Sequence, residues 1–422
     1  MRHEPTGPEQ PVAEPRPARH PDSNTLPEAD RDLSVRQFPR VGFCPLSGRY
    51  YLGINPKSAC STVKYTLWAA EFAAGRIDKA PPKKKKGIHG AADAIFRRAD
   101  LATLATDLAA TPRVTMVRNP YTRLLSCYLE KIAGSKPPKK IALLDLGLDR
   151  NEPLSFATFV QIVARQDSRD MDAHWAPQAY LGQPRDLRYD IIGSLEAIDT
   201  DMDRILVAAG LPPRPVESYI PHRTGAGKAI DKHYTDDLIA LVRTRYAEDF
   251  AAFGYSTDIG EALAPPDRAN ANGERVSGSD ILSEPLDALT RAVAAARTGS
   301  SRKALATLRA AIETYPRVPE LHVEAGEVSL DLGDLDAADR HLREAVALNG
   351  EAIRYRLLLT NCLIRRGEQS AALAVAEATR ELSPGRPRVL KTLAHCHKLN
   401  GNTMMASEIE DLAERFVALK VK

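Results

Sequence analysis

Two stretches in the N-terminal half of the chain pass from an apolar strand pattern into a helical pattern. Tyr50–Ile54 is a short apolar run that predicts a buried strand, and apolar residues recur at helical spacing from Val63 onwards. Arg113–Arg118 predicts a second strand. Asn119 and Pro120 then open a helix, since Asn is a favoured N-cap and Pro suits the first helical position. In one parallel sheet, the two strand-to-helix junctions would lie side by side at the carboxyl edge, where open α/β sheets bind ligands.

The first junction has the composition of an anion-binding loop. Lys57 brings a positive charge, and Ser58, Ser61 and Thr62 bring hydroxyl donors. Backbone N–H groups and the helix dipole add to the preference of a helix N-terminus for anions. Neither the ATP loop that ends in Gly-Lys-Ser/Thr nor the Gly-x-Gly-x-x-Gly dinucleotide fingerprint follows a predicted strand. We therefore expect a phosphate-binding loop of another kind, and two such junctions would suit a ligand with two separated phosphate groups.

The C-terminal third of the chain repeats with a period of 34 residues. Small residues mark this period at two positions of each unit, as Gly299, Gly333, Gly367 and Gly401 and as Ala304, Ala338, Ala372 and Ala406. Small residues at a fixed period allow paired helices to approach closely, and the pattern resembles tetratricopeptide repeats. We expect an all-α tetratricopeptide-repeat domain over residues 284–422, with about four helix pairs and a protein partner.

Composition and charge set broad limits. A chain of 422 residues with 43% hydrophobic content is long enough for two or three domains, and its net charge of +3 is too small to indicate nucleic-acid binding. Five cysteines without a Cys-x-x-Cys pair suit a reducing compartment. No apolar run approaches the ~20 residues that cross a bilayer, and no secretory signal is evident, so we expect a cytoplasmic protein without a transmembrane segment. Residues 1–38 are expected to be disordered, and residues 259–283 to form a linker.

Four stretches of the chain resemble, in order, the motifs of sulfotransferases that use PAPS (3′-phosphoadenosine-5′-phosphosulfate). Asn55–Thr62 is similar to the 5′-phosphosulfate loop of the membrane-type carbohydrate family, family 2, and Arg118–Tyr128 is similar to the 3′-phosphate motif of the superfamily. The other similar stretches are Asp172–Gln178 together with Tyr189–Glu196, and Tyr246–Tyr255. The resemblance covers roughly residues 45–258.

This resemblance implies an α/β domain over residues 39–258, in which a P-loop-like parallel sheet is flanked by helices. It implies PAPS as the sulfate donor, no metal, and a hydroxyl or amine acceptor on a carbohydrate. The implied cofactor-binding residues are Lys57, Ser58, Ala59, Cys60, Ser61, Thr62, Arg118 and Ser126. Lys57 would neutralise charge on the departing 5′-phosphate, while Arg118 and Ser126 would hold the 3′-phosphate.

A general base must take the proton of the acceptor, and two histidines are candidates. Histidine suits proton transfer near neutral pH. His89 lies between the two phosphate loops, where related sulfotransferases carry a catalytic histidine, and His174 lies in the third similar stretch. For His174 the alternative is a buried ring that is bonded to a carboxylate such as Asp172.

Several basic residues have two interpretations. Arg123 would contact either the nucleotide or a carboxylate of its own domain. Lys64 is expected to be a solvated helix residue, with a second cofactor contact as the alternative. Two basic loops, residues 79–87 and 136–140, are either solvated or form a rim that attracts a polyanionic substrate.

Three functions remain open at this point. The first is a PAPS-dependent sulfotransferase that acts on a carbohydrate and carries a helical-repeat module. The second is a sulfotransferase of a protein or small molecule that is steered by the repeats. The third is a non-catalytic adaptor on a degenerate sulfotransferase fold, and the intact Lys57, Arg118 and Ser126 argue against it.

Overall fold

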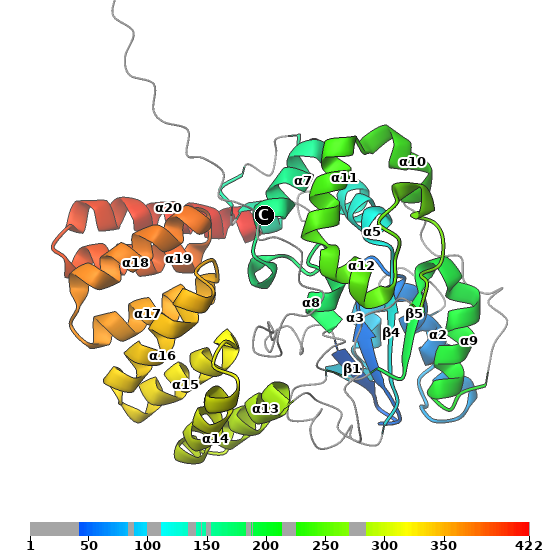
Figure 1. The fold of residues 1–422 in the computed structure, drawn as a ribbon, viewed down its shortest axis with the longest axis horizontal. Coiled ribbons are helices and arrows are strands. Elements are labelled where there is room, and N and C mark those ends of the chain that lie inside the picture. The colour runs from blue at the N-terminus through cyan, green and yellow to red at the C-terminus, as the bar shows by residue number, and fades with distance from the viewer. Residues whose placement is uncertain are drawn as a thin grey trace, which may run out of the picture.

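A computed structural model describes residues 42–82, 88–98, 111–133, 141–144, 146–148, 153–182, 187, 189–212, 225–269 and 284–421. An α/β domain lies beside an all-helical domain (Figure 1). The segment expected to be disordered, residues 1–38, lies outside the described residues. So do residues 83–87 of the first basic loop and the whole of the second.

The sheet of the α/β domain is mixed. Its described strands are β1 (Gly42–Pro45), β2 (Tyr51–Ile54), β3 (Phe96–Arg98), β4 (Arg113–Val117) and β5 (Ile191–Ser194), in the order β3-β1-β2-β4-β5. Strands β2 and β4 are parallel, as predicted, and β5 is parallel to β4, but β1 is antiparallel to both β2 and β3. The expectation of a parallel sheet is therefore wrong at this edge. Only residues 46–50 join β1 to β2, which is too short for the crossover that a parallel pair requires.

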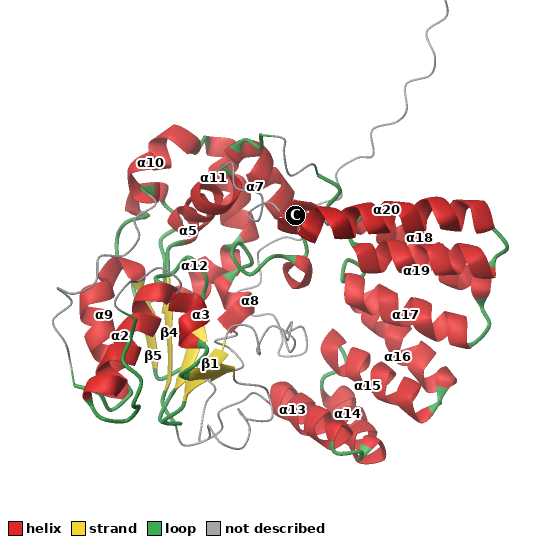
Figure 2. Ribbon diagram, turned by 180° about the vertical axis from the view of Figure 1, so that it is seen from behind, coloured by secondary structure: helices red, strands yellow, loops and turns green. Residues whose placement is uncertain are grey.

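Helices cover one face of this sheet and its carboxyl edge. Helices α2 (Cys60–Ala73), α3 (Ile88–Ala92) and α9 (Ile198–Ala208) pack on one face, as Figure 2 shows from behind. A second apolar cluster joins the remaining helices of the domain to the end of β4. These are α5 (Pro120–Cys127), α7 (Phe156–Arg165), α8 (Gln178–Gly182), α10 (Ala226–His233), α11 (Asp236–Arg245) and α12 (Ala247–Phe253), with the short α6 (Ile141–Leu144) nearby.

The C-terminal region is helical throughout residues 284–421, apart from short turns. Its helices are α13 (Glu284–Arg297), α14 (Ser301–Thr314), α15 (Pro319–Leu332), α16 (Leu335–Leu348), α17 (Ile353–Arg365), α18 (Gln369–Leu382), α19 (Pro387–Leu399) and α20 (Thr403–Val421). The four periodic glycines each adopt a left-handed φ of 77° to 80° at the turn between paired helices, and the four periodic alanines are fully buried. The period of 34 therefore sets a repeat of helix pairs, because a left-handed turn favours glycine and a close helix contact favours alanine.

The helical domain packs against the second face of the sheet at β2. Tyr51 of β2 and Tyr189 share one apolar cluster with Leu286 and Leu289 of α13. Leu52, the next residue of β2, belongs to the cluster under α2 and α9 instead. Successive residues of a strand point to opposite faces, so β2 lies between two packed layers. The two domains thus share a core.

Residues 259–269, the first part of the expected linker, pack against the α/β domain. Ala262 is buried in the same apolar cluster as α5 and α12. Arg268 forms an ion pair with the buried Asp201 of α9. The α/β domain therefore extends to residue 269, and residues 270–283 lie outside the described part of the chain.

Candidate active site

The loop after β2 has an unusual backbone. Lys57 and Ala59 adopt left-handed φ values of 72° and 57°, and they are the non-glycine residues with positive φ in the described ranges. Such a conformation costs on the order of 1–3 kcal/mol per residue and persists where the surroundings enforce it, often at ligand sites. Helix α2 begins directly afterwards at Cys60, so Ser61 and Thr62 lie in its first turn. The loop and the helix N-terminus together favour an anion.

Lys57 forms an ion pair with Glu130, a residue that the sequence did not single out. Glu130 lies in a π-helical turn, Tyr128–Ile132, that continues α5. The Lys57 side chain is only 7% exposed, and its burial lowers its pKa, which Glu130 opposes. Burial acts upward on the pKa of Glu130, but the hydrogen bond and charge of Lys57 outweigh it and lower that pKa to about 2. Glu130 is therefore ionised at neutral pH.

Arg118 connects the two junctions. Its Nη1 donates to the backbone oxygen of Lys57 at 3.2 Å, and its Nε donates to Thr122 Oγ1 at 2.9 Å. Burial lowers the pKa of Arg118 to about 10, so it remains a cation at neutral pH. Ser126 is buried on α5, about two turns beyond the start of that helix. The Asn119 side chain accepts from Tyr121 N–H, which confirms the predicted N-cap.

Gln178 fixes the relative position of the two loops. Its Oε1 accepts from Ser58 Oγ at 2.8 Å and from Arg118 N–H at 2.9 Å, and its Nε2 donates to the Arg118 carbonyl at 2.7 Å. The side chain is fully buried, and the buried Asp249 accepts from its backbone N–H. Ser58 N–H in turn donates to the Asn55 carbonyl. Both donors of Ser58 thus have partners within the protein.

Burial raises the pKa of Asp249, and the charge of Arg123 opposes this rise. Arg123 therefore acts on a carboxylate of its own domain, which is one of its two expected interpretations. The guanidinium is buried and donates to three backbone carbonyls, those of Pro56 at 3.0 Å, Ala176 at 2.8 Å and Ala173 at 3.0 Å. It therefore clamps the loop after β2 to residues 173–176. The local motif could not show this, because the carbonyls are about 50 and 67 residues away in the sequence.

The expectation that Lys64 is solvated is wrong. The residue is 3% exposed, and its Nζ lies 3.7 Å from the centre of the Phe43 ring. A cation over an aromatic face is attracted by the ring quadrupole, which offsets part of the cost of burial. Nearby, burial raises the pKa of the Cys60 thiol, so this cysteine is a neutral group rather than a nucleophile.

His174 is held by Asp172. Its Nδ1 lies 2.6 Å from Asp172 Oδ1, but the ring is 39% exposed rather than buried. Burial acts upward on the pKa of Asp172, but the hydrogen bonds and charge of His174 outweigh it and lower that pKa. Nδ1 is engaged, so Nε2 is the atom that can exchange a proton with a ligand. His89 lies in α3, but its side chain is outside the described part of the molecule, so the choice between the two histidines stays a prediction.

Glu196 holds the start of the second junction by accepting two hydrogen bonds. Its Oε1 accepts from Asn119 N–H at 3.0 Å and its Oε2 from Tyr255 Oη at 2.7 Å.

Within the described ranges, no group of three or more His, Cys, Asp or Glu side chains could hold a metal ion. No helix in those ranges is both long and apolar enough to span a membrane.

Comparison with known proteins finds sulfotransferases. Residues 51–256 match the model of the sulfotransferase family. Carbohydrate sulfotransferase 14 of Danio rerio is 28% identical over 228 residues, which is 47% of this chain and 58% of the relative. The Homo sapiens protein of the same name is 26% identical over 223 residues, 47% of this chain and 56% of the relative. The chain thus spans a little over half the length of these curated relatives.

Comparison with solved structures gives weaker likenesses. A crystal structure of MamA covers 32% of this chain and 80% of its own, at 19% identity and a TM-score of 0.31. A likeness of this size supports no conclusion. The family match, in contrast, covers both junctions, Gln178 and the Asp172–His174 pair. Residues 51–256 of this chain are thus similar to the sulfotransferase family.

Proposed function

We propose that the protein transfers the sulfuryl group of PAPS to a hydroxyl or amine of a carbohydrate. The observation that carries this proposal is the direct contact between the two cationic junctions, in which Arg118 Nη1 bonds the carbonyl of Lys57 at 3.2 Å. Two adjacent cations suit a donor with phosphate groups at its 5′ and 3′ positions. The printed names of the relatives support a carbohydrate acceptor.

Bound PAPS would supply the sulfuryl group and leave as 3′,5′-ADP. The Lys57 ammonium and the backbone N–H groups of residues 59–62 would bind the 5′-phosphate, whose negative charge grows as its bond to sulfur breaks. Arg118 and Ser126 would hold the 3′-phosphate. Lys57 must exchange its contact with Glu130 for a contact with the donor.

The acceptor oxygen or nitrogen forms its bond to sulfur while its proton moves to a base. We assign this role to His174 Nε2, with Asp172 holding the ring through Nδ1. Glu130 also lies beside Lys57, but a carboxylate with a pKa of about 2 is a poor base near neutral pH. His89, which lies between the two phosphate loops in the sequence, remains the other candidate.

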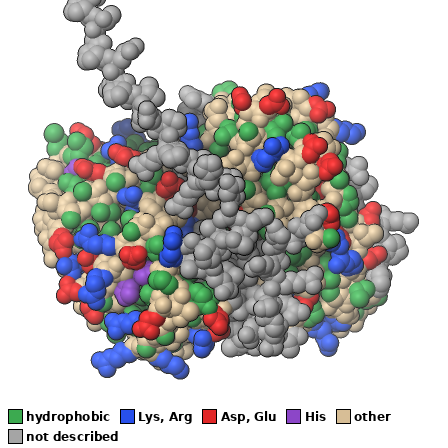
Figure 3. Space-filling model, viewed as in Figure 1, with side chains coloured by type: hydrophobic (Ala, Val, Ile, Leu, Met, Phe, Trp, Pro, Cys, Tyr) green, Lys and Arg blue, Asp and Glu red, His purple; other side chains and the backbone are tan. Residues whose placement is uncertain are grey.

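We propose tetratricopeptide repeats for the helical domain, with a protein as partner. The repeat of helix pairs at a period of 34 supports this proposal. On the face drawn in Figure 3, basic and acidic side chains are interspersed over this domain, so this face would suit a partner of mixed charge. A location in a reducing, cytoplasmic compartment stays a prediction from the cysteine pattern.

Incubation with radiolabelled PAPS and glycan, lipid and protein fractions of the source organism tests the acceptor class. We expect label in the glycan fraction. Label in the protein or small-molecule fraction would favour the second hypothesis. Absence of transfer to every fraction, together with absence of 3′,5′-ADP binding, would leave the adaptor hypothesis.

A further inference from the structure

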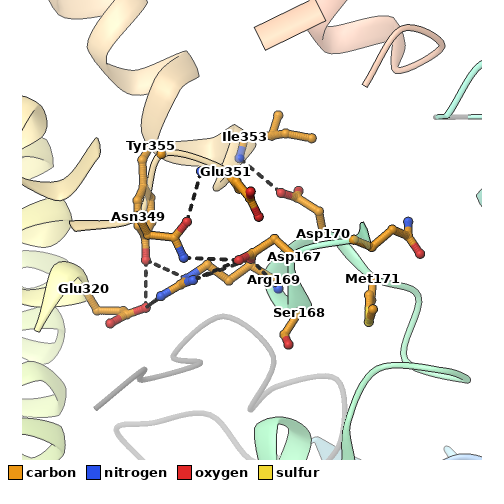
Figure 4. Close-up of polar contacts among 12 residues, drawn as sticks. Asp167, Ser168, Arg169, Asp170, Met171, Glu320, Asn349, Glu351, Ile353 and Tyr355 are labelled. Carbon is orange, nitrogen blue, oxygen red and sulfur yellow. Dashed lines mark hydrogen bonds and ion pairs between the residues drawn. The ribbon is translucent and has the colours of Figure 1, made fainter. Parts of the chain in front are cut away.

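One segment, Gln166–Gln178, contacts both the helical domain and the nucleotide loops. Its first part forms a short 3₁₀ turn, Ser168–Asp170, that faces α15 and α17 (Figure 4). Its last residue, Gln178, binds both loops of the site. His174 lies between these two anchored ends.

Arg169 is the centre of the contact with the helical domain. Its guanidinium donates to Glu320 Oε1 of α15 through Nη2 at 3.1 Å and to Tyr355 Oη of α17 through Nε at 3.0 Å. Tyr355 Oη also donates to Glu320 at 2.7 Å. The side chains of Arg169 and Glu320 are only 12% and 6% exposed, so the pair is largely removed from water. Arg169 also pairs with Asp167 of its own segment at 3.4 Å. Removal of Arg169 or Glu320 would break a largely buried ion pair, which is costly.

The residues on both sides of Arg169 bind the helical domain as well. Asp167 accepts from Asn349 Nδ2 at 3.2 Å. Asp170 accepts from the backbone N–H of Ile353 at 3.1 Å and from Arg386 Nη1 at 2.7 Å. Charge-assisted hydrogen bonds of this kind are directional. The network therefore fixes the orientation of the Ser168–Asp170 turn as well as the distance between the domains.

The other end of the segment is fixed just as firmly. Arg123 binds the carbonyls of Ala173 and Ala176, and Tyr246 Oη donates to the Trp175 carbonyl at 2.5 Å. The backbone N–H groups of His174, Trp175 and Ala176 all donate to Asp172. The turn that carries His174 starts at Asp172, only two residues after Asp170.

This polar network is separate from the apolar contact that holds the two domains together. The apolar cluster that contains Tyr51 and Leu289 already joins them at the face of the sheet. The polar network lies at a different place, and it acts on the segment that carries His174.

We propose that Arg169 is a positioning residue through which the helical domain holds the His174 turn in register with the nucleotide loops. This inference rests on the proposed function for its catalytic consequence, but not for its structural one. A partner that moved α15 or α17 would then alter transfer at a distance, because Glu320 and Tyr355 belong to those helices.

Hydrogen exchange of the full chain without added nucleotide tests the structural part. In Arg169→Ala, exchange of the His174, Trp175 and Ala176 amides should rise at least about fivefold, since their opening becomes easier. Arg169→Lys should give a smaller rise. Tyr355→Phe, which changes only the helical domain, should also raise exchange at these three amides. Arg343→Ala is the matched control, because Arg343 is 51% exposed and pairs with Asp339 on its own helix.

Sulfate transfer from labelled PAPS to the glycan fraction tests the catalytic part. We expect kcat to fall about tenfold in Arg169→Ala, since small misplacements of a catalytic group are costly. The KM for PAPS and the Kd of 3′,5′-ADP should stay within about twofold, because the nucleotide loops keep their own contacts. Unchanged exchange in both Arg169→Ala and Tyr355→Phe would overturn the proposal, and so would a kcat equal to wild type. Wild-type protein that neither binds 3′,5′-ADP nor transfers sulfate would instead refute the proposed function.

Discussion

Lys57 combines two unfavourable features that make sense at a ligand site. Its backbone is left-handed, and its side chain is only 7% exposed. Each feature costs free energy in the unliganded protein; Glu130 offsets part of the second, and an incoming anion would do so as well. At this scale the site is preformed and its central cation is held by Glu130.

Replacement of Lys57 by Ala should reduce kcat/KM for sulfate transfer by roughly 10²–10³-fold, because the charge on the leaving 5′-phosphate loses its principal counter-charge. The thermal unfolding midpoint should fall modestly, because Glu130 loses an ion-pair partner while the cost of burying the Lys57 ammonium is removed. Lys131→Ala is the control, because Lys131 also pairs with Glu130 but is 30% exposed. Transfer by Lys57→Ala within a few-fold of wild type would refute the assigned role.

The Lys57–Glu130 pair also predicts a pH dependence of stability. The folded protein holds the pKa of Glu130 at about 2, below its ordinary value of 4.5. A lowered carboxylate pKa contributes stability above the unfolded value, and this contribution is lost as pH falls towards the folded value. Urea unfolding between about pH 6 and pH 3 should therefore show a steeper loss of stability in wild type than in Glu130→Gln. If the free energy of unfolding fell equally with pH in the two proteins, the stabilising role of the Lys57–Glu130 pair would be refuted.

Local motifs identify some residues of the site but not their partners. Lys57 and Arg118 follow strands and precede helices, so their position can be inferred from a few neighbouring residues. Glu130 and Gln178 meet these loops across 73 and 120 residues of sequence, and no spacing rule links them. Burial of Lys64 is likewise a tertiary effect, because Phe43 comes from the antiparallel edge strand.

At the scale of elements, the helical repeat is the part that sequence predicts best. The left-handed glycine and the buried alanine are local requirements of each helix pair, so they recur at a fixed spacing. The antiparallel pairing of β1 with β2 was missed, because apolar residues in β1 do not indicate strand direction.

Ala338→Leu should destabilise the helical domain by about 1–3 kcal/mol, because the alanine is fully buried between helices and leaves no room for a larger side chain. Ala347→Leu on the same helix should change stability by less than about 0.5 kcal/mol, since Ala347 is exposed. Urea unfolding followed by circular dichroism would measure both. Equal effects at the two positions would contradict the packing assigned to the period of 34.

At the scale of the whole molecule, the two domains form one structure and not a catalytic unit with a flexible attachment. The apolar run of β2 indicates burial on both faces, but the sequence does not say which element covers each face. The structure places α13 on one of them. The polar network at Arg169 is a second, separate contact.

This arrangement predicts that a change in the helical domain lowers the stability of the α/β domain. Both tryptophans, Trp68 and Trp175, lie in the α/β domain, so their fluorescence reports on that domain alone. Leu289→Ala should lower the fluorescence midpoint, consistent with a cost of about 2–5 kcal/mol for a buried leucine. Leu263→Ala, at a leucine that is 62% exposed, should leave it nearly unchanged. An unchanged midpoint in Leu289→Ala would mean that the domains unfold independently.

The central claim is that the two joined junctions form a site for a nucleotide with 5′ and 3′ phosphates. Isothermal titration of the full chain with 3′,5′-ADP tests it most directly. We predict saturable binding at one site, weakened about 10- to 100-fold by Arg118→Ala through loss of its charge-assisted bonds to the 3′-phosphate. Binding that Arg118→Ala leaves unchanged, or no binding by wild type, would contradict the account.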